Sequence, residues 1–385
     1  MAKQPFATIK RRNDTIEAIL RVLDRKRHFL IVGHQSPDED CIASMVAFGL
    51  LASKFNKHAE IYLPGKVHEH FQYLLSICRY NAIRVVEGNA QVRLPIDVVV
   101  ACDTPKPDML EANRTIRAAM KRERTVIVEI DHHMGGDSEY IGQDGYCLVT
   151  EATSSAELVG HLVLKLRWSE RLLKKYAMGD PLTRNLVLAI LTGIVGDSKM
   201  GRFLKTRREQ HYYRLFSGLL ETILAEQTTK SSNASSMEEI YREIQKLSAT
   251  EERCYQYFME HVRVENSVGV AVLGCDHGEE LYREFDRDVI VSVARTVADE
   301  IAEKGGKLSL VGYCDDPKSS DLIQFRMRRS RDFRGIDLRD LLPLLGITNG
   351  GGHEGAVGFR ATRAQIGDLD AFVARILSTL QEQLG

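Results

Sequence analysis

The sequence has little that would place the protein in or across a membrane. Its longest apolar run, residues 186–196, is far shorter than the roughly 20 residues that a transmembrane helix needs. The first residues, Met1-Ala2-Lys3-Gln4-Pro5-Phe6, lack the apolar segment of a secretory signal. We therefore expect a cytoplasmic protein with no membrane partner.

Paired cysteines and an excess of one charge are also absent. The seven cysteines show no C-x-x-C spacing, and an odd number without a signal segment predicts reduced thiols. The formal net charge is −1, which excludes a uniformly basic nucleic-acid-binding scaffold. Any phosphate-binding site must then come from a local arrangement of residues.

Hydrophobic patterning in the first half of the chain predicts an α/β fold. Short continuous apolar runs alternate there with helical stretches, and the runs lie at residues 29–32, 59–63, 96–102 and 125–130. Continuous runs of this length are typical of buried parallel strands. We therefore expect a parallel sheet with helices on both faces.

The length of 385 residues exceeds the usual size of one hydrophobic core and predicts two domains. The polar segment 228–235 is typical of a linker between them. We expect one domain over residues 1–227, a linker with a connecting helix over 228–250, and a smaller α/β domain over 251–385.

Three strands of the predicted sheet end in side chains that can bind a metal ion. The first strand leads into a polar loop, the second ends in one carboxylate, and the third ends in an acidic residue and two histidines. These residues are His34, Asp38, Asp40, Asp103, Asp131, His132 and His133. Because the carboxyl ends of parallel strands meet at one edge of a sheet, we expect these side chains to share a crevice.

The mixture of carboxylates and imidazoles favours Mn²⁺, Mg²⁺, Fe²⁺ or Zn²⁺ over iron–sulfur or copper–thiolate chemistry. The set holds more ligands than one ion requires, which predicts two ions about 3.5–4 Å apart. Cys41 and Cys102 stand beside these ligands in the sequence, and we interpret both as small core residues.

These residues, in this order, resemble the motifs of the DHH phosphoesterases. The family's four motifs match His34-x-x-Pro37-Asp38-x-Asp40, Asp103, Asp131-His132-His133 and Asp197. Near the C-terminus, Gly350-Gly351-Gly352-His353 resembles the glycine-rich sequence of the DHH-associated substrate domain. The ordered set is far more specific than any single motif, and it extends across both predicted domains.

The resemblance implies a role for each motif residue, with two ions, Mn²⁺ first among them, as the cofactors. One ion is held by His34, Asp38 and Asp103, and the other by Asp40, Asp103, His132 and Asp197. Asp103 thus bridges the ions, His133 contacts the scissile phosphate or assists proton transfer, and Asp131 orients a histidine. Asp197 rests on the resemblance alone; it follows an apolar helix that we expect to begin at Asp180-Pro181.

In the second domain, the resemblance implies that Arg328, Gly350, Gly351, Gly352 and His353 bind the substrate. Consecutive glycines let backbone amides approach an anion closely, and the planar fork of an arginine suits phosphate. The neighbouring Arg326 and Arg329 stay unassigned, because a run of charges is usually a solvated face.

The implied activity is hydrolysis of short oligonucleotides or nucleotide phosphates, as in the oligoribonuclease and phosphoadenosine-phosphate phosphatase branch of the family. Exopolyphosphatase and cyclic or linear dinucleotide phosphodiesterase are the enzymatic alternatives, and a catalytically silent nucleotide-binding regulator is another class. Glu39 stands where the family often has glycine, and Gly196 where threonine is frequent. A homodimer is the default oligomeric state.

Overall fold

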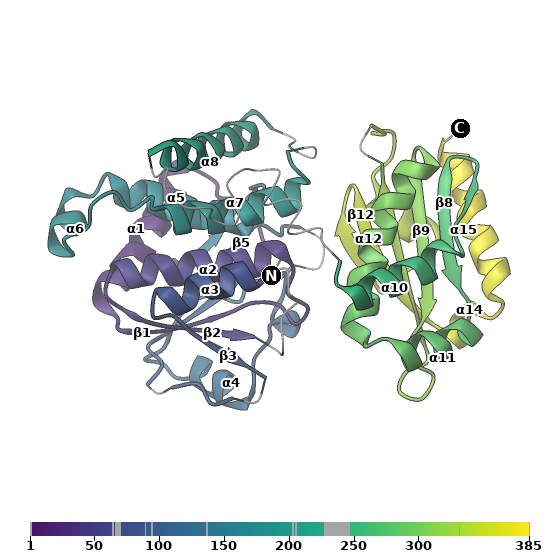
Figure 1. Cartoon of the computed structure of the whole chain (residues 1–385), viewed down its shortest axis with the longest axis horizontal. Helices are drawn as coiled ribbons and strands as arrows, with labels where there is room; N and C mark the ends of the chain where they lie inside the picture. Colours follow the sequence, from purple (N-terminus) through teal and green to yellow (C-terminus); the bar gives the residue numbers. More distant parts are fainter. Residues whose placement is uncertain are drawn as a thin grey trace. The chain divides into compact units, whose positions relative to one another are not determined.

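The computed structural model describes residues 2–63, 65, 71–88, 90–93, 95–135, 138–201, 204, 206–226, 247–330 and 332–384. The chain forms two compact units, residues 1–246 and 247–385, and each unit has its own sheet (Figure 1). The polar segment 228–235, predicted to be a linker, lies outside the described residues.

The first unit is built on a six-stranded parallel sheet, which confirms the predicted α/β fold. Its strands are β1 (His28–Val32), β2 (His58–Leu63), β3 (Arg84–Glu87), β4 (Val98–Cys102), β5 (Val126–Asp131) and β6 (Cys147–Val149). Their order is β3-β2-β1-β4-β5-β6, and all neighbours pair in parallel. The chain therefore extends the sheet to one side of β1 and then returns to place β4 on the other side. Ligand sites in open sheets gather at such a reversal.

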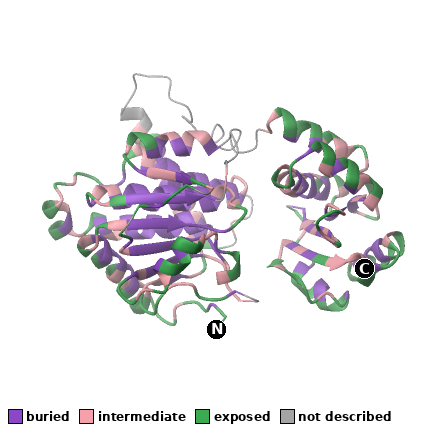
Figure 2. Cartoon of the chain, turned by 90° about the horizontal axis from the view of Figure 1, so that it is seen from below, coloured by how far each residue is buried: buried purple, intermediate pink, exposed green. Residues whose placement is uncertain are grey.

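Helices cover both faces of this sheet, because successive residues of each strand point to opposite sides. Ile31 belongs to the larger core, which includes α1 (Ile9–Arg25), α2 (Glu39–Lys54), α3 (Gln72–Tyr80), α5 (Ser155–Arg167) and α7 (Arg184–Ser198). Leu30 and Val32 belong to a smaller core with α4 (Arg114–Met120) on the other face. Figure 2 shows the strands as almost continuously buried. None of the described helices has the length and apolar content needed to cross a membrane.

Helix α7 begins later than the sequence predicts. The expected start at Asp180-Pro181 is wrong, because the helix begins at Arg184 with Thr183 as its N-cap. Asp180 Oδ1 instead accepts a hydrogen bond from Leu182 N (3.0 Å), which forms a turn ahead of the helix. Two further helices of this unit are α6 (Glu170–Lys175) and α8 (Arg207–Glu226), and α8 packs against α7.

Close packing of α7 depends on glycine. A Cβ added at Gly193 would lie 2.4 Å from Asp40 Oδ1 and 2.5 Å from Ala156 Cβ. Real Cβ atoms do not approach other atoms so closely, so a larger residue would push α7 away from the first turns of α2 and α5. Gly193 therefore helps to place the C-terminal end of α7 beside those turns.

The second unit contains a mixed six-stranded sheet. Its strands are β7 (Arg263–Glu265), β8 (Val268–Leu273), β9 (Leu308–Cys314), β10 (Leu322–Arg329), β11 (Gly350–His353) and β12 (Ala356–Thr362). Their order is β11-β12-β10-β9-β8-β7, and only β8 and β9 pair in parallel among these neighbours. The connection from β8 to β9 runs through α11 (Cys275–Glu284) and α12 (Arg287–Gly305).

Helices also lie on both faces of the second sheet. Val311 and Tyr313 share a core with residues of α10 (Ala249–Met259) and α12. Phe325 and Met327 share the opposite core with residues of α13 (Leu338–Leu344) and α15 (Leu369–Leu384). A short helix, α14 (Arg363–Ile366), follows β12. The second unit is thus a smaller α/β fold, as predicted.

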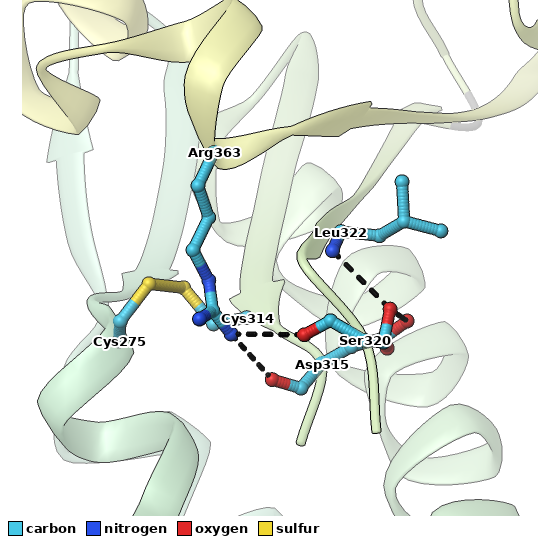
Figure 3. The surroundings of a disulfide bond; sticks show 6 residues. All are labelled: Cys275, Cys314, Asp315, Ser320, Leu322 and Arg363. Atoms are coloured by element: carbon cyan, nitrogen blue, oxygen red, sulfur yellow. Dashed lines mark hydrogen bonds between the residues drawn. A yellow bond between two sulfur atoms is a disulfide. The ribbon is translucent and has the colours of Figure 1, made fainter. Parts of the chain in front are cut away.

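A disulfide joins Cys275 at the start of α11 to Cys314 at the end of β9 (Figure 3). The prediction that all seven cysteines are reduced is therefore wrong for this pair, while the other five are free thiols. The residues are 39 positions apart, and only the parallel pairing of β8 with β9 brings them together. Beside the disulfide, the Arg363 guanidinium donates to the carbonyl oxygens of Asp315 (3.0 Å) and Ser320 (3.3 Å).

Candidate metal centre

The predicted metal ligands of the first unit lie at the reversal in the sheet. His34 follows β1, Asp103 follows the adjacent β4, and Asp131 ends β5. Asp103 adopts a left-handed conformation (φ 50°), and its amide donates to the Ile130 carbonyl oxygen (2.9 Å). Non-glycine residues adopt this conformation rarely and at some energetic cost, so the chain bends sharply at Asp103.

One group of donor atoms surrounds His34. Its Nε2 lies 3.6 Å from Asp38 Oδ1 and 3.7 Å from Asp103 Oδ2. The Cys41 thiol also lies within 4.8 Å of ligand atoms of His34 and Asp103. Cys41 is fully buried, as expected of a core residue, but it lies in the lining of the site as well.

A second group surrounds His132. Its Nε2 lies 3.4 Å from Asp103 Oδ1, 3.3 Å from Asp197 Oδ2 and 3.8 Å from Asp40 Oδ2. Asp103 therefore presents one carboxylate oxygen to His34 and the other to His132. The geometry places Asp103 between the two groups of donors.

The acidic residues are held by the first turns of two helices. Asp38 is the N-cap of α2, where its side chain accepts from Cys41 N (3.3 Å). Asp40 is almost fully buried and accepts from Ser155 N (2.5 Å) and Ala156 N (2.9 Å) at the start of α5. The partial positive charge of a helix N-terminus stabilises such a carboxylate.

Ser155 is a residue of this site that the sequence analysis missed. Its backbone amide donates to Asp40, and its hydroxyl donates to Asp103 Oδ1 (2.9 Å). One residue thus fixes two carboxylates. The run Thr153-Ser154-Ser155 does indicate the start of a helix, but nothing in it indicates a contact with residues more than 50 positions away.

The two histidines of the motif have different surroundings. His132 Nδ1 lies 3.3 Å from the Ala152 carbonyl oxygen, a contact in which the ring nitrogen donates and leaves Nε2 directed at the carboxylates. His133 Nδ1 lies 2.8 Å from Asp131 Oδ1, and 41% of its side chain is exposed. Asp131 therefore contacts His133, the more accessible of the pair.

Crowding of carboxylates gives the site its electrostatic character. Burial raises the pKa of Asp197 to about 7, with Asp38 and Asp103 adding to the effect. Burial and the negative charges of Asp103 and Asp197 raise the pKa of Asp40 well above its ordinary value. Burial disfavours a charged His132, but contacts with Asp103 and Asp197 outweigh it and raise the pKa of that imidazole. Four acidic residues and two imidazoles in so small a volume suit divalent cations, which relieve the repulsion.

Glu39 and Gly196, two positions that depart from the family pattern, lie against each other. A Cβ added at Gly196 would lie 2.7 Å from Glu39 Cβ. A threonine at position 196 would therefore clash with Glu39 unless α7 moved. The larger residue at position 39 and the glycine at position 196 form a matched pair at the junction of α2 and α7.

The predicted substrate-binding residues of the second unit lie on β10 and β11, the two strands that flank β12. Arg328 on β10 pairs in register with Ala356 on β12, which in turn pairs with His353 on β11. Arg328 Nε donates to Asp299 Oδ1 of α12 (3.1 Å). Gly350, Gly351 and Gly352 form the rest of β11, and a Cβ at Gly352 would lie 2.1 Å from the Ala356 carbonyl oxygen.

The neighbouring arginines of β10 divide between its two faces. Arg329 is buried, donates to the Ile336 carbonyl oxygen (2.8 Å) and pairs with Glu354 (3.2 Å), so its contacts are structural. Arg326 shares the face of Arg328 and pairs in register with Gly358, which pairs with Gly351. On the side of β12 and β11, the row beside Arg326 therefore consists of glycines, whereas on the side of β9 Arg326 pairs with Val311.

Comparison with known proteins gives the first unit its family. Residues 28–194 match the DHH family, N-terminal domain. The chain is 28% identical over 190 residues to the cyclic-di-AMP phosphodiesterase GdpP of Bacillus subtilis (strain 168). This match covers 47% of this chain and 26% of that protein. It is also 33% identical over 104 residues to the manganese-dependent inorganic pyrophosphatase of the same organism. This match covers 27% of this chain and 30% of the pyrophosphatase. The chain thus spans less than a third of the length of these curated relatives.

A similar fold is known for the whole chain. The crystal structure of an exopolyphosphatase-related protein from Bacteroides fragilis superposes with a TM-score of 0.61 and covers 96% of both chains. The sequences are 16% identical, so the likeness concerns the fold alone. The motif order predicts the same family as the match over residues 28–194, and this region is a DHH family N-terminal domain.

Proposed function

We propose that this chain is a metal-dependent phosphoesterase that hydrolyses short oligonucleotides or nucleotide phosphates. One observation carries the proposal: Asp103 lies between two groups of donors, with one oxygen 3.7 Å from His34 Nε2 and the other 3.4 Å from His132 Nε2. A shared carboxylate of this kind is what a pair of neighbouring divalent cations requires.

In this proposal, His34, Asp38 and Asp103 hold one ion, and Asp40, Asp103, His132 and Asp197 hold the other. Mn²⁺ is the first choice, supported by the manganese-dependent pyrophosphatase among the relatives. When bound, two such ions activate a water molecule and neutralise charge on a phosphate group. The Ser155 and Ala156 amides and the Ala152 carbonyl fix the directions of Asp40 and His132 before any ion binds.

His133 is assigned the contact with the scissile phosphate or the transfer of a proton. Its Nδ1 is engaged with Asp131, so Nε2 is the ring atom left to meet a substrate. The 41% exposure of its side chain gives a substrate access to the ring. Asp131 holds the imidazole rather than reacting, as buried carboxylates commonly do beside a working histidine.

Arg328, Gly350, Gly351, Gly352 and His353 are proposed to bind the rest of the substrate. The support is their placement in one region of the second sheet and the chemistry of arginine toward phosphate. An arginine paired with a single acidic partner, as Arg328 is with Asp299, keeps N–H donors for a ligand.

Two alternatives have specific support. Identity to the manganese-dependent pyrophosphatase favours an inorganic pyrophosphate or polyphosphate substrate, and identity to the cyclic-di-AMP phosphodiesterase favours a cyclic or linear dinucleotide. A catalytically silent nucleotide-binding regulator would not need a complete set of ligands. Here every predicted ligand of the first unit lies beside at least one other.

The test is a substrate panel with the full chain in Mn²⁺ at one fixed salt concentration, because phosphate contacts are screened by salt. The panel holds dinucleotide RNA, a long RNA, phosphoadenosine phosphate, a linear dinucleotide, pyrophosphate and polyphosphate. We expect the highest kcat/KM with the dinucleotides or phosphoadenosine phosphate. Fastest turnover of the inorganic compounds would favour the first alternative, and turnover of none would refute the phosphoesterase proposal.

A further inference from the structure

Lys3 lies in the interior of the first unit, beside the residues of the candidate metal centre. Its side chain is fully buried. The ammonium nitrogen lies 2.7 Å from the Thr104 carbonyl oxygen and 2.7 Å from Glu129 Oε1, and it also pairs with Asp131 Oδ2. The ammonium donates hydrogen bonds to Thr104 and Asp131, and its contact with Glu129 is an ion pair.

Two of the three partners of Lys3 are the immediate neighbours of proposed metal ligands, and the third lies on the same strand as Asp131. Thr104 follows Asp103, and Asp131 precedes His132. Glu129 points to the same side of β5 as Asp131, because side chains two positions apart on a strand share a face. Glu129 Oε2 accepts from the amides of Ile141 and Gly142 (2.9 Å each), which fixes its position.

The N-terminal segment is held in place by backbone contacts with the chain after β5. Lys3 N donates to the Ser138 carbonyl oxygen (3.3 Å), and the Lys3 carbonyl oxygen accepts from Gly135 N (3.4 Å). Ala2 forms an antiparallel bridge with Glu139. These contacts direct the side chain inward, so the burial of Lys3 belongs to the fold of this segment.

Asp131 connects Lys3 to His133. One oxygen of the carboxylate pairs with the Lys3 ammonium, and the other lies 2.8 Å from His133 Nδ1 and 3.3 Å from His133 N. A carboxylate with only the histidine as partner can rotate or accept from either ring nitrogen. With Lys3 on the far oxygen, the near oxygen is aimed at Nδ1.

We propose that Lys3 is a positioning residue that acts through Asp131 to hold His133 in the Nδ1–H tautomer, with Nε2 directed at the substrate. The catalytic part of this inference rests on the proposed phosphoesterase function. The part that concerns the tautomer of His133 does not, since it depends on contacts within the chain: Asp131 Oδ1 lies 2.8 Å from His133 Nδ1, and Asp103 Oδ1 lies farther away at 3.6 Å.

A merely structural role for Lys3 is the alternative to test against. Two buried carboxylates, Glu129 and Asp131, share the Lys3 ammonium, and its removal leaves both without this positive charge. Lys3→Met would then act on stability alone. The double variant Lys3→Met/Glu129→Gln separates the roles, because it removes one buried negative charge together with the positive one.

The experiment compares the wild-type chain, Lys3→Met, the double variant and the control Lys10→Met, an exposed lysine in the same segment. Long-range ¹H–¹⁵N spectra of histidine-labelled protein report the tautomer of His133, whose signal is assigned with His133→Gln. We expect Nδ1–H in the wild type and in Lys10→Met. In both Lys3 variants we expect a tautomer mixture, and kcat about tenfold or more lower with KM and Mn²⁺ stoichiometry little changed.

A double variant that folds, keeps the His133 tautomer and turns over at the wild-type rate would overturn the proposal. Uncharged side chains at positions 3 and 129 would then be enough to hold Asp131 and His133 in place. A double variant that fails to fold would also overturn it, by placing the need for Lys3 in folding. The spectra require no turnover. If the chain cleaves none of the tested substrates, the proposed function is refuted, but the spectra still show whether Lys3 sets the tautomer of His133.

Discussion

The two units use different six-stranded sheets, one parallel and one mixed, to present opposite charges. In the first unit, acids and histidines lie at the ends of parallel strands and in the first turns of helices, where several of them are buried. In the second, Arg326 and Arg328 lie along one face of a single strand, and Arg328 is already paired with Asp299. A cluster of buried carboxylates is stable only with cations beside it, whereas a paired arginine needs no further partner. We therefore propose that the first unit holds ions, and that the second binds an anionic substrate through the N–H donors of Arg328 that Asp299 does not occupy.

The largest effect is expected at the residue shared by both groups of donors. Asp103→Asn keeps the shape of the side chain but weakens its bonds to two ions at once. We expect turnover to fall by about 1,000-fold or more, with loss of bound metal measured by elemental analysis. Asp108→Asn, an exposed acid nearby, is the matched control. Wild-type turnover with full metal content in Asp103→Asn would remove the bridging role.

His133 is expected to affect the chemical step. His133→Gln should lower kcat by about 100-fold to 10,000-fold, the range found for groups that transfer protons, while KM changes little. Metal content should stay at the wild-type level, because Asp103, Asp40 and Asp197 remain around His132. Loss of metal in this variant would instead make His133 a ligand.

Arg328 is expected to affect binding, in contrast to His133. Arg328→Met should raise KM about tenfold with kcat little changed, because a charge-assisted contact with phosphate operates in ground and transition states alike. Arg334→Met, an exposed arginine after the same strand, is the control. An unchanged KM for every cleaved substrate would show that the second unit binds through other residues.

The crowded carboxylates also predict a pH dependence of stability. Because burial raises the pKa of Asp197 to about 7, its contribution to folding is complete below the unfolded value of about 4 and is lost as the pH rises through about 7. Mn²⁺ relieves this loss, so it should raise the melting temperature about 5 °C more at about pH 7.5 than at about pH 5.5. Scanning fluorimetry with and without chelator measures the difference. This difference between the two pH values should be smaller in Asp197→Asn. An equal rise of the melting temperature with Mn²⁺ at both pH values would contradict the raised pKa of Asp197.

Much of the first site follows from strand order. His34, Asp103 and Asp131 each end an apolar run, and parallel pairing places such ends at one edge. Local sequence patterns do not identify Asp197 or Lys3, because tertiary packing brings both residues to the site. Asp197 depends on the close approach of α7 that Gly193 permits, and Lys3 depends on contacts more than 100 positions away.

Sequence patterns also gave wrong predictions at two positions where tertiary contacts determine the structure. Asp180-Pro181 has the chemistry of a helix start, yet the turn at Leu182 delays α7 to Arg184. The Cys275–Cys314 disulfide could not be predicted from spacing, because the two residues meet only through the register of β8 and β9.

The most direct test of the central claim is a count of the ions that the first unit binds. Metal-free protein titrated with Mn²⁺, followed by calorimetry and by electron paramagnetic resonance, gives the stoichiometry and any coupling between ions. The bridging role of Asp103 predicts two coupled ions per chain, and loss of the coupling together with at least one ion in Asp103→Asn. A single uncoupled ion in the wild type, or two ions retained in Asp103→Asn, would contradict it.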